Sequence, residues 1–265
     1  MNLGRARSFF DTVGSHIPTR RDVRGNQTTP HHIAFTMDGN RRWARANGVP
    51  ALRGHRQGAL ALRRTIDAAI NENIPWLTFY AFSTENWNRA PDEVDALMGL
   101  ARNFSGDHLE ELHRKGAHLR VLGERHGLDA ELVDSIEKAE ALTKNNDVVY
   151  VNLAFNYSGR YDLTRAVKQI VRKIADGEMD PEEINASELG AHLSTAGMPP
   201  PDLLIRTGGE QRLSNFLLWE SAYSELLFMD VLWPDFGAEA LREAIEIFRQ
   251  RTSRAGTYPN RAAGA

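Results

Sequence analysis

Short apolar segments recur along the chain, and between them lie longer segments in which apolar residues return every three or four positions. Six of the short segments have the length and composition of buried β-strands. These segments are His32–Met37, Trp76–Phe82, His118–Leu122, Val148–Phe155, Asp202–Ile205 and Leu226–Phe228.

The longer segments predict helices. The clearest begins with Pro91-Asp92-Glu93, a favourable first turn, and is predicted to end near Gly116. Its apolar residues fall close to helical spacing: Val94, Leu97, Met98, Ala101, Phe104 and Leu112. The other predicted helices are Gly58–Asn73, Asp129–Lys144, Tyr161–Ala175 and Ala238–Arg251.

Alternating strands and helices of this length predict a single α/β domain, in which helices flank a six-stranded, mostly parallel sheet. Ligands bind such sheets beyond the carboxyl ends of the strands, so the residues that follow each strand are the first candidates for a site.

The composition adds limits to this picture. The chain has 265 residues, 42% of them hydrophobic, which suffices for one sizeable core. Its formal net charge of −3 gives no general attraction to nucleic acid, and no nucleic-acid partner is expected. The absence of cysteine excludes a disulfide scaffold and thiolate metal sites, and it fits a cytoplasmic protein.

The two ends of the chain differ from the middle. Residues 1–30 hold five arginines and only a short apolar patch at Phe9-Phe10, which predicts a flexible basic arm rather than a signal peptide or a membrane anchor. The longest uncharged apolar stretch, Ile74–Thr84, is far shorter than the ~20 residues of a membrane span. We therefore place the domain at residues 31–254 and a tail at 255–265.

The first predicted strand ends in Asp38, Gly39, Asn40, Arg41, Arg42 and Trp43. A turn glycine before a helix start, with two arginines, is typical of an anion site. Asp38 repels phosphate unless a divalent cation lies between them, and Mg²⁺ commonly uses one or two carboxylates plus substrate phosphates. An N-capping aspartate with surface arginines is the alternative reading.

Two further strands end in similar chemistry. The second is followed by Ser83, Thr84, Glu85, Asn86, Trp87 and Arg89, and an ordinary turn does not account for the tryptophan and arginine. The fifth leads into a Gly-Gly loop holding Arg206, Arg212, Leu213 and Ser214. Two arginines and a hydroxyl can clamp a diphosphate, although a tight turn with solvated charges is the alternative. Three such strand ends together favour a phosphorylated ligand.

Other common site motifs are missing from the sequence. The nine histidines form no HExxH or similar pairing, which disfavours a zinc site. No Walker-type loop or GxGxxG is present, and Ser83 lacks the G-x-S-x-G context of an α/β-hydrolase.

The chain resembles the cis-prenyltransferases, the undecaprenyl diphosphate synthases and their relatives, over about residues 31–254. Several ordered motifs carry this resemblance: His32-Ile33-Ala34, Met37–Ala44, Gly54-His55, Tyr80–Trp87, Asn156–Arg160, Asp202–Arg212, Ser214–Trp219, Tyr223-Ser224-Glu225 and Leu232–Asp235.

The resemblance implies a fold with an elongated hydrophobic tunnel, a homodimer, and a Mg²⁺-dependent condensation of isopentenyl diphosphate with an allylic diphosphate to form a cis-polyprenyl diphosphate. Peripheral membrane contact during product release is also expected. It implies the following roles: Asp38 and Glu225 as metal ligands; Gly39, Asn40, Arg41, Arg42, Trp43 and His55 around the allylic diphosphate; Ser83, Thr84, Glu85, Asn86, Trp87 and Arg89 at the condensation site; Arg206, Arg212, Leu213 and Ser214 around isopentenyl diphosphate.

In the family the asparagine matched by Asn86 is often assigned the removal of the proton. Because asparagine is a poor base, we interpret Asn86 as an orienting group and leave open Asp38, a phosphate oxygen or water as the acceptor.

The sequence departs from the family pattern at two positions. Arg41 stands where many bacterial members have glycine, and Ala51 stands where many have an arginine, which Arg53 can partly replace. Arg254-Ala255-Gly256 resembles an element that some members extend into the partner's active site, and a frayed tail is the alternative. Two other functions are alternatives: a non-catalytic partner subunit, which the retained Asp38 and Asn86 disfavour, and a head-to-middle prenyl coupling enzyme, which the retained Asn86 disfavours.

Residues on the expected tunnel wall point to a product longer than a single condensation gives. Ala81 leaves the upper tunnel open, whereas Phe104 can close it or simply pack in the core. Val149 and Val151 leave the floor neither clearly open nor clearly shut.

Overall fold

The structure is a computed structural model that describes residues 29–102 and 107–254. Most of the predicted arm, the predicted tail, Phe104, and Ala255 and Gly256 of the Arg254-Ala255-Gly256 element lie outside the described residues. The strands are β1 (His32–Thr36), β2 (Trp76–Ser83), β3 (Ala117–Leu122), β4 (Val149–Tyr157), β5 (Leu203–Arg206) and β6 (Glu225–Phe228). The helices are α1 (Asn40–Ala46), α2 (Ala51–Asn71), α3 (Pro91–Arg102), α4 (Asp107–Arg114), α5 (Ala130–Thr143), α6 (Gly159–Ala175), α7 (Ala186–Ala191) and α8 (Ala238–Arg254).

All six predicted strands are present and form one sheet in the order β3-β4-β2-β1-β5-β6. Each of the five pairings is parallel, so the described sheet is wholly parallel where we predicted a mostly parallel one. Thr36, at the end of β1, lies opposite Tyr80 of β2 and Arg206 of β5. The carboxyl ends of these three adjacent strands therefore meet at one edge.

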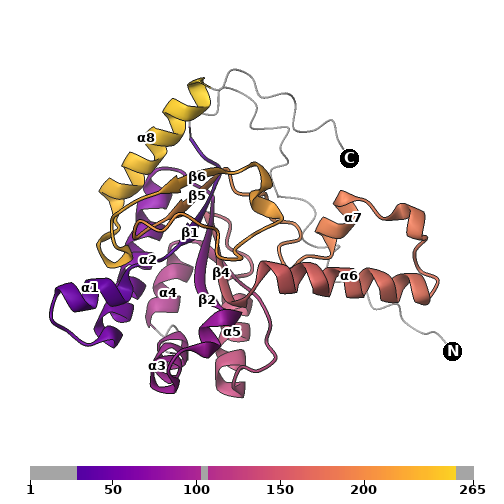
Figure 1. Cartoon of the computed structure of the whole chain (residues 1–265), viewed down its shortest axis with the longest axis horizontal. Helices are drawn as coiled ribbons and strands as arrows, with labels where there is room; N and C mark the ends of the chain where they lie inside the picture. Colours follow the sequence, from indigo (N-terminus) through magenta and orange to yellow (C-terminus); the bar gives the residue numbers. More distant parts are fainter. Residues whose placement is uncertain (1–28, 103–106, 255–265) are drawn as a thin grey trace.

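The sheet is buried on both faces, which explains why its strands are nearly continuous apolar runs. Ile33 and Phe35 face one layer, where residues of α2 and α8 join the same core cluster. Ala34 faces the other layer and packs with Phe216 and Leu217 of the segment after β5. Figure 1 shows α6 and α7 forming an arm that projects from this body.

Two predicted helices differ from those observed. Helix α2 begins at Ala51 rather than Gly58, directly after Pro50. The inner face of its first two turns is glycine, because a Cβ on Gly54 would collide with the Asn40 main-chain oxygen. In place of the single helix predicted from Pro91 to Gly116, the described residues contain α3 up to Arg102 and α4 from Asp107. None of the described helices is long and apolar enough to cross a membrane.

Candidate active site

Asp38 and Arg206 bring the ends of β1 and β5 together. The guanidinium of Arg206 donates from Nε to Asp38 Oδ2 at 2.9 Å, and its Nη2 lies 2.7 Å from the same oxygen. Only 3% of the Arg206 side chain is exposed, against 34% of Asp38. A buried charge needs such partners. The pair therefore fixes the Asp38 carboxylate at the carboxyl ends of β1 and β5, which we call the rim of the site, and leaves part of the carboxylate exposed to a ligand.

Two further donors of Arg206 hold the loop that follows β5. Its Nη1 donates to Ser214 Oγ at 2.7 Å and also to the main-chain oxygen of Arg212. Thr207 completes the junction, because its hydroxyl donates to the Asp38 main-chain oxygen at 2.8 Å. One buried guanidinium thus connects Asp38 with the predicted serine of the fifth strand end.

Arg42 and Arg212 form the outer part of this rim. Both lie near Glu210, with Arg212 Nη1 at 2.5 Å and Arg42 Nη2 at 3.9 Å from its carboxylate oxygens. The Arg42 guanidinium also covers Gly208, where the φ of +82° favours glycine and a Cβ would lie 2.5 Å from Arg42 Nη2. Arginines from the first and fifth strand ends are therefore close to one another, as their positions predicted.

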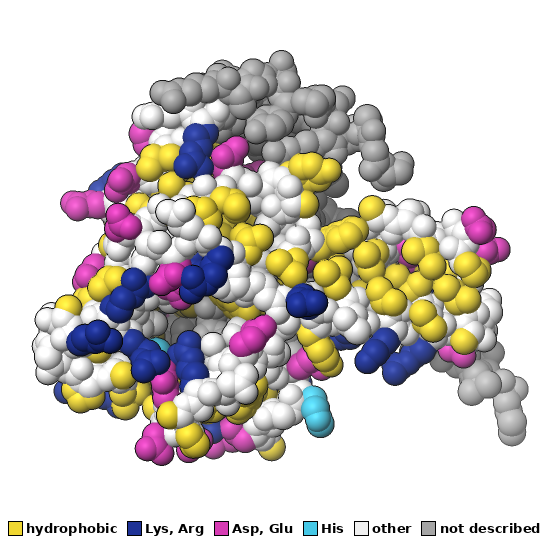
Figure 2. All heavy atoms as spheres, viewed as in Figure 1, with side chains coloured by type: hydrophobic (Ala, Val, Ile, Leu, Met, Phe, Trp, Pro, Cys, Tyr) yellow, Lys and Arg dark blue, Asp and Glu magenta, His cyan; other side chains and the backbone are white. Residues whose placement is uncertain are grey.

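Glu93 organises a second group of basic side chains. Its carboxylate lies 3.0 Å from Arg89 Nη1, 3.8 Å from Arg41 Nη1 and 3.5 Å from His55 Nε2. Burial lowers the pKa of His55, and its buried Nε2 makes no hydrogen bond among the described residues. Figure 2 shows basic side chains around a hollow beside α1. This second group gives the rim further positive charge.

The loop after β2 is a short 3₁₀ helix, Thr84–Asn88. Asn86 accepts a hydrogen bond from the Ser83 main-chain N–H at 3.2 Å and caps this helix reciprocally with Ser83. The Trp87 indole donates to Asn156 Oδ1 at 2.9 Å, which ties the loop to the end of β4. Glu85 bonds to Thr84 at 3.4 Å and to Asn215 at 2.8 Å.

Several candidates have mainly structural contacts. The Trp43 indole donates to Asp235 at 2.7 Å and so anchors α1. Leu213 packs partly buried against the second core layer. Gly39 has a φ of +117°, and a Cβ there would lie 2.9 Å from Leu232. Asn40 is held against Gly58, where a Cβ would collide with its Oδ1.

Glu225 is the predicted site residue that lies away from the carboxyl ends of the strands. It is the first residue of β6 and pairs in register with Leu203, the first residue of β5. Asp38 lies beyond Thr36, which pairs with the last residue of β5. Within one chain the two carboxylates therefore lie at opposite ends of the parallel strands, so Glu225 does not join Asp38 there, and the prediction that Glu225 completes the metal site stays a prediction. Glu225 instead lies 3.5 Å from Arg251.

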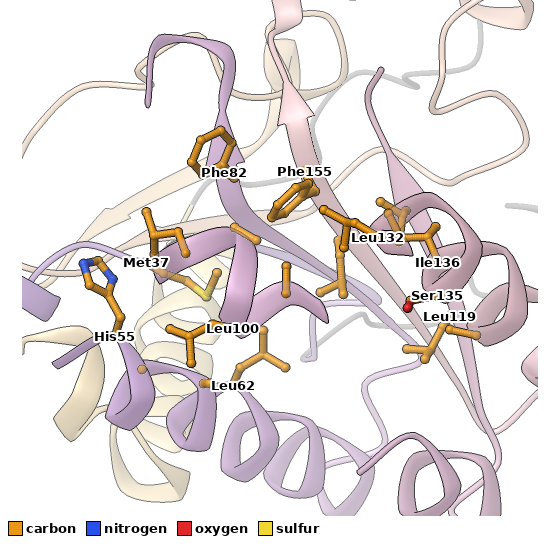
Figure 3. A pocket seen from close by; sticks show the side chains of 18 of the residues that line it. Met37, His55, Leu62, Phe82, Leu100, Leu119, Leu132, Ser135, Ile136 and Phe155 are labelled. Atoms are coloured by element: carbon orange, nitrogen blue, oxygen red, sulfur yellow. The ribbon is translucent and has the colours of Figure 1, made fainter. Parts of the chain in front are cut away.

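An apolar cavity lies beneath the rim. The cavity itself has a volume of about 190 Å³, within a wider hollow of about 1170 Å³ that includes the open mouth. Figure 3 shows His55 at one end, with Leu119 and Ser135 at the other. Much of the lining comes from apolar residues of β2, β3 and β4, among them Ala81 and Phe82, and the rest comes largely from α2, α3 and α5.

Two site residues were not predicted from the sequence. Glu93 was interpreted only as a helix start, although its position four residues after Arg89 is a signal for an ion pair. Asn215 directly follows the predicted Ser214, and its side chain contacts Glu85 and Ser158. The roles of both depend on segments that are distant in the sequence.

The fold and the site define a class of protein. It is an α/β protein in which a basic rim, built on three adjacent parallel strand ends, lies over an apolar cavity. Such a site can hold an anionic head group at the rim and an apolar chain below it. Asp38 offers the exposed carboxylate that a divalent cation needs, and no cluster of three acidic or histidine side chains occurs among the described residues.

Comparisons with known proteins identify the family. Residues 36–256 match the family described as putative undecaprenyl diphosphate synthase, and the chain belongs to it. The chain is 47% identical to isoprenyl transferase 2 of Bradyrhizobium diazoefficiens, over 86% of this chain and 90% of that one. It is 46% identical to the ditrans,polycis-undecaprenyl-diphosphate synthase, (2E,6E)-farnesyl-diphosphate specific, of Xylella fastidiosa, over 87% and 91%.

A solved structure shares the fold. Lavandulyl diphosphate synthase from Lavandula x intermedia, in complex with dimethylallyl diphosphate, superposes with a TM-score of 0.81 at 37% identity. The match covers 84% of this chain and 96% of that one. Family and fold therefore agree with the resemblance seen in the sequence.

Proposed function

We propose that this protein is an isoprenyl transferase that condenses isopentenyl diphosphate with an allylic diphosphate, giving a cis-polyprenyl diphosphate and releasing diphosphate. The observation that carries the proposal is the basic rim at three strand ends directly above an apolar cavity. Family membership and the names of the relatives support the same reaction.

The rim arginines divide between the two substrates. Arg206, Arg212 and Ser214 would bind isopentenyl diphosphate, since Arg206 ends β5, the other two lie in the loop that follows, and Arg206 already bonds Ser214. Arg41, Arg42, Arg89 and His55 would bind the allylic diphosphate, whose apolar chain enters the cavity that His55 lines. Charge-assisted bonds from several arginines suit diphosphate oxygens.

The reaction forms a bond between C4 of isopentenyl diphosphate and C1 of the allylic substrate as the bond from C1 to the diphosphate oxygen breaks. The π electrons of isopentenyl diphosphate form the new bond, and the electron pair of the broken bond leaves with diphosphate. The C2–H electron pair becomes the new double bond as its proton passes to a phosphate oxygen, water or Asp38. Arginines aimed at the leaving diphosphate stabilise the charge that develops there. Asn86, held by the Ser83 N–H, orients the reacting groups.

Asp38 would hold Mg²⁺, the cofactor we propose. Only one of its oxygens is bonded to Arg206 in the described contacts, and a third of the side chain is exposed. Mg²⁺ commonly takes one or two carboxylates and fills its other positions with phosphate oxygens and water, which fits this single carboxylate. When bound, the ion would neutralise the charge of the departing diphosphate.

We also propose a homodimer. In the sequence, the apolar run Phe216-Leu217-Leu218-Trp219 and Tyr223 predict an apolar interface core. Phe216 and Leu217 are fully buried within the chain, so the prediction is wrong for these two residues, whereas Trp219 and Tyr223 are exposed. Further exposed apolar side chains lie on α6 and near α7: Tyr161, Val167, Val171 and Ile184. Figure 2 shows apolar side chains gathered over the arm of α6 and α7. A second copy covering this surface would also explain how Glu225 reaches a metal site: from the partner.

Replacing Val171 by aspartate is expected to shift the protein to monomers, because it places a charge in the proposed interface. Light scattering over a range of concentrations measures the change. Leu142→Asp is the matched control, since Leu142 is also an exposed apolar residue but lies on α5. A wild type that is monomeric and fully active at assay concentration would contradict the proposal.

A head-to-middle coupling enzyme is the second candidate, because the lavandulyl diphosphate synthase shares this fold closely. The two reactions are separated by incubating the purified protein with labelled isopentenyl diphosphate, dimethylallyl diphosphate and longer allylic primers. Chain elongation of the primer supports the proposed function. Coupling of two dimethylallyl units without elongation would establish the alternative, and no incorporation of any substrate would exclude both.

The cavity is proposed to be the tunnel that receives the growing prenyl chain. Ala81→Leu is expected to shorten the product distribution, because Ala81 lines the cavity and the larger side chain narrows it. Chromatography of the dephosphorylated products measures chain length. An unchanged distribution would show that the chain does not pass this residue. Contact with a membrane surface during product release also stays a proposal.

A further inference from the structure

Two loops of the site belong to strands that are not neighbours. The loop after β2 carries Glu85 and Asn86, whereas the loop after β5 carries Arg212 and Ser214, and β1 lies between the two strands. No backbone ladder therefore joins these loops directly. If one loop helps to bind each substrate, their spacing determines how the two reacting carbons meet.

The side chain of Asn215 connects the two loops. Its Nδ2 donates to Glu85 Oε1 at 2.8 Å and to Ser158 Oγ at 2.7 Å, while its Oδ1 accepts the Arg160 main-chain N–H at 2.9 Å. Since a carboxylate only accepts and a main-chain N–H only donates, these partners determine which end of the amide carries the nitrogen. Both donors of the amide are used.

The backbone of Asn215 fits the same role. Its main-chain oxygen accepts the Gly159 N–H at 2.8 Å, and its φ of +64° is one that asparagine tolerates better than most residues. Ser214 and Leu217 also have positive φ, at +50° and +42°. Such conformations cost energy and persist when surrounding contacts hold them, as the bonds of Asn215 do here.

The connection continues to the centre of the site. Ser214 precedes Asn215 and accepts from Arg206, which in turn bonds Asp38. Glu85 accepts the hydrogen bond from Asn215 on the other loop. Burial alone would raise the pKa of Glu85, but its hydrogen bonds, the largest contribution coming from Asn215, lower the pKa overall. Glu85 is therefore a carboxylate acceptor at neutral pH, the partner that the Asn215 amide requires.

We propose that Asn215 is a positioning residue, which fixes the loop of Ser214 and Arg212 relative to the loop of Glu85 and Asn86 and thereby aligns the two substrates. The proposal rests on the proposed function. Asn215 itself is not a catalytic residue, because it acts through Ser214 and Glu85. Misplacing reacting groups by about 1 Å can cost about 10²-fold in rate, so a loss of this contact should be visible in kcat.

The test uses a pair of variants that reverses the polarity of the bond. Asn215→Asp keeps the size and the tolerance of positive φ but sets a carboxylate against Glu85. It is expected to lower kcat about 10- to 100-fold at saturating substrates. In the double variant Asn215→Asp/Glu85→Gln, the amide introduced at position 85 can donate to the carboxylate introduced at position 215. A recovery of kcat of about tenfold over Asn215→Asp is therefore expected.

Controls separate positioning from folding. Asn185→Asp is the matched control, because Asn185 is an exposed N-cap of α7 and aspartate caps helices equally well; wild-type kinetics are expected. Thermal denaturation of every variant shows whether it folds. A purely structural role predicts a lower melting temperature with kcat per folded molecule unchanged, and that result would overturn the proposal.

Two further outcomes are decisive. Wild-type kcat in Asn215→Asp, or a double variant no better than the two single changes combined, would also refute the role of Asn215. Failure of the proposed function looks different, because the wild type itself would then incorporate no isopentenyl diphosphate. In that case the melting temperatures of the wild type, the two single variants and the double variant still test whether Glu85 and Asn215 interact.

Discussion

Asp38→Asn is expected to lower kcat by ~10²–10³-fold or more while the protein keeps its fold. The asparagine oxygen can still accept from Arg206, so the buried guanidinium retains an acceptor at the position that Asp38 Oδ2 occupies. What is lost is the negative charge needed to hold a divalent cation against diphosphate. Steady-state rates at saturating Mg²⁺, compared with thermal denaturation of the same samples, measure the two effects separately.

Asp38→Ala provides the comparison. It removes the charge and also leaves Arg206 without that acceptor, so it is expected to destabilise the protein by about 1–3 kcal/mol in addition to losing activity. This is below the range of about 3–5 kcal/mol for a fully buried pair, because a third of Asp38 is exposed and water can replace it. Wild-type-like turnover of Asp38→Asn would rule out the assignment.

Arg206→Ala is expected to lower kcat by ~10²–10³-fold and to raise the Michaelis constants of both substrates. The sequence alone predicts an effect mainly on isopentenyl diphosphate. The structure changes that expectation, since Arg206 also bonds Asp38, through which the allylic diphosphate would be held. Initial rates with each substrate varied in turn measure both constants.

Arg212→Ala should behave differently, because Arg212 lies at the exposed rim and contacts Glu210. We expect about a tenfold rise in the Michaelis constant of isopentenyl diphosphate, equivalent to the loss of one solvent-exposed charge-assisted bond. Arg45→Ala, an exposed arginine on α1, serves as the control for general charge effects. Equal effects of Arg206→Ala and Arg212→Ala would contradict this division of the rim.

Much of the fold could be predicted because its strands are short apolar runs with polar residues at both ends. All six predicted strands are confirmed. Because the sheet is buried on both faces, each strand consists almost entirely of apolar residues and stands out in the sequence. The start of α2 could not be predicted from apolar periodicity, because its inner face there consists of Gly54 and Gly58. Glycine is selected at these positions by contact with Asn40, which the sequence does not reveal.

The site was predictable where its residues follow a strand and unpredictable where it depends on packing. Asp38 and Arg206 follow from the rule for parallel strand ends. Glu93 gains its role only because the first turn of α3 lies beside His55 of α2 and Arg41 of α1. The separation of Glu225 from Asp38 was foreseeable, since Glu225 precedes the apolar residues of β6 and so begins that strand.

The difference in exposure between the arginines affects how the site responds to dissolved salt. Arg41 and Arg212 are 68% and 61% exposed, whereas Arg206 is almost completely buried. At about 0.1 M ionic strength the screening length is about 10 Å, and it acts strongly on exposed charges and weakly on buried ones. Diffusional capture of the two anionic substrates should therefore slow as salt is added. Once a substrate is seated against Arg206, the stabilisation of its charge should be nearly independent of ionic strength.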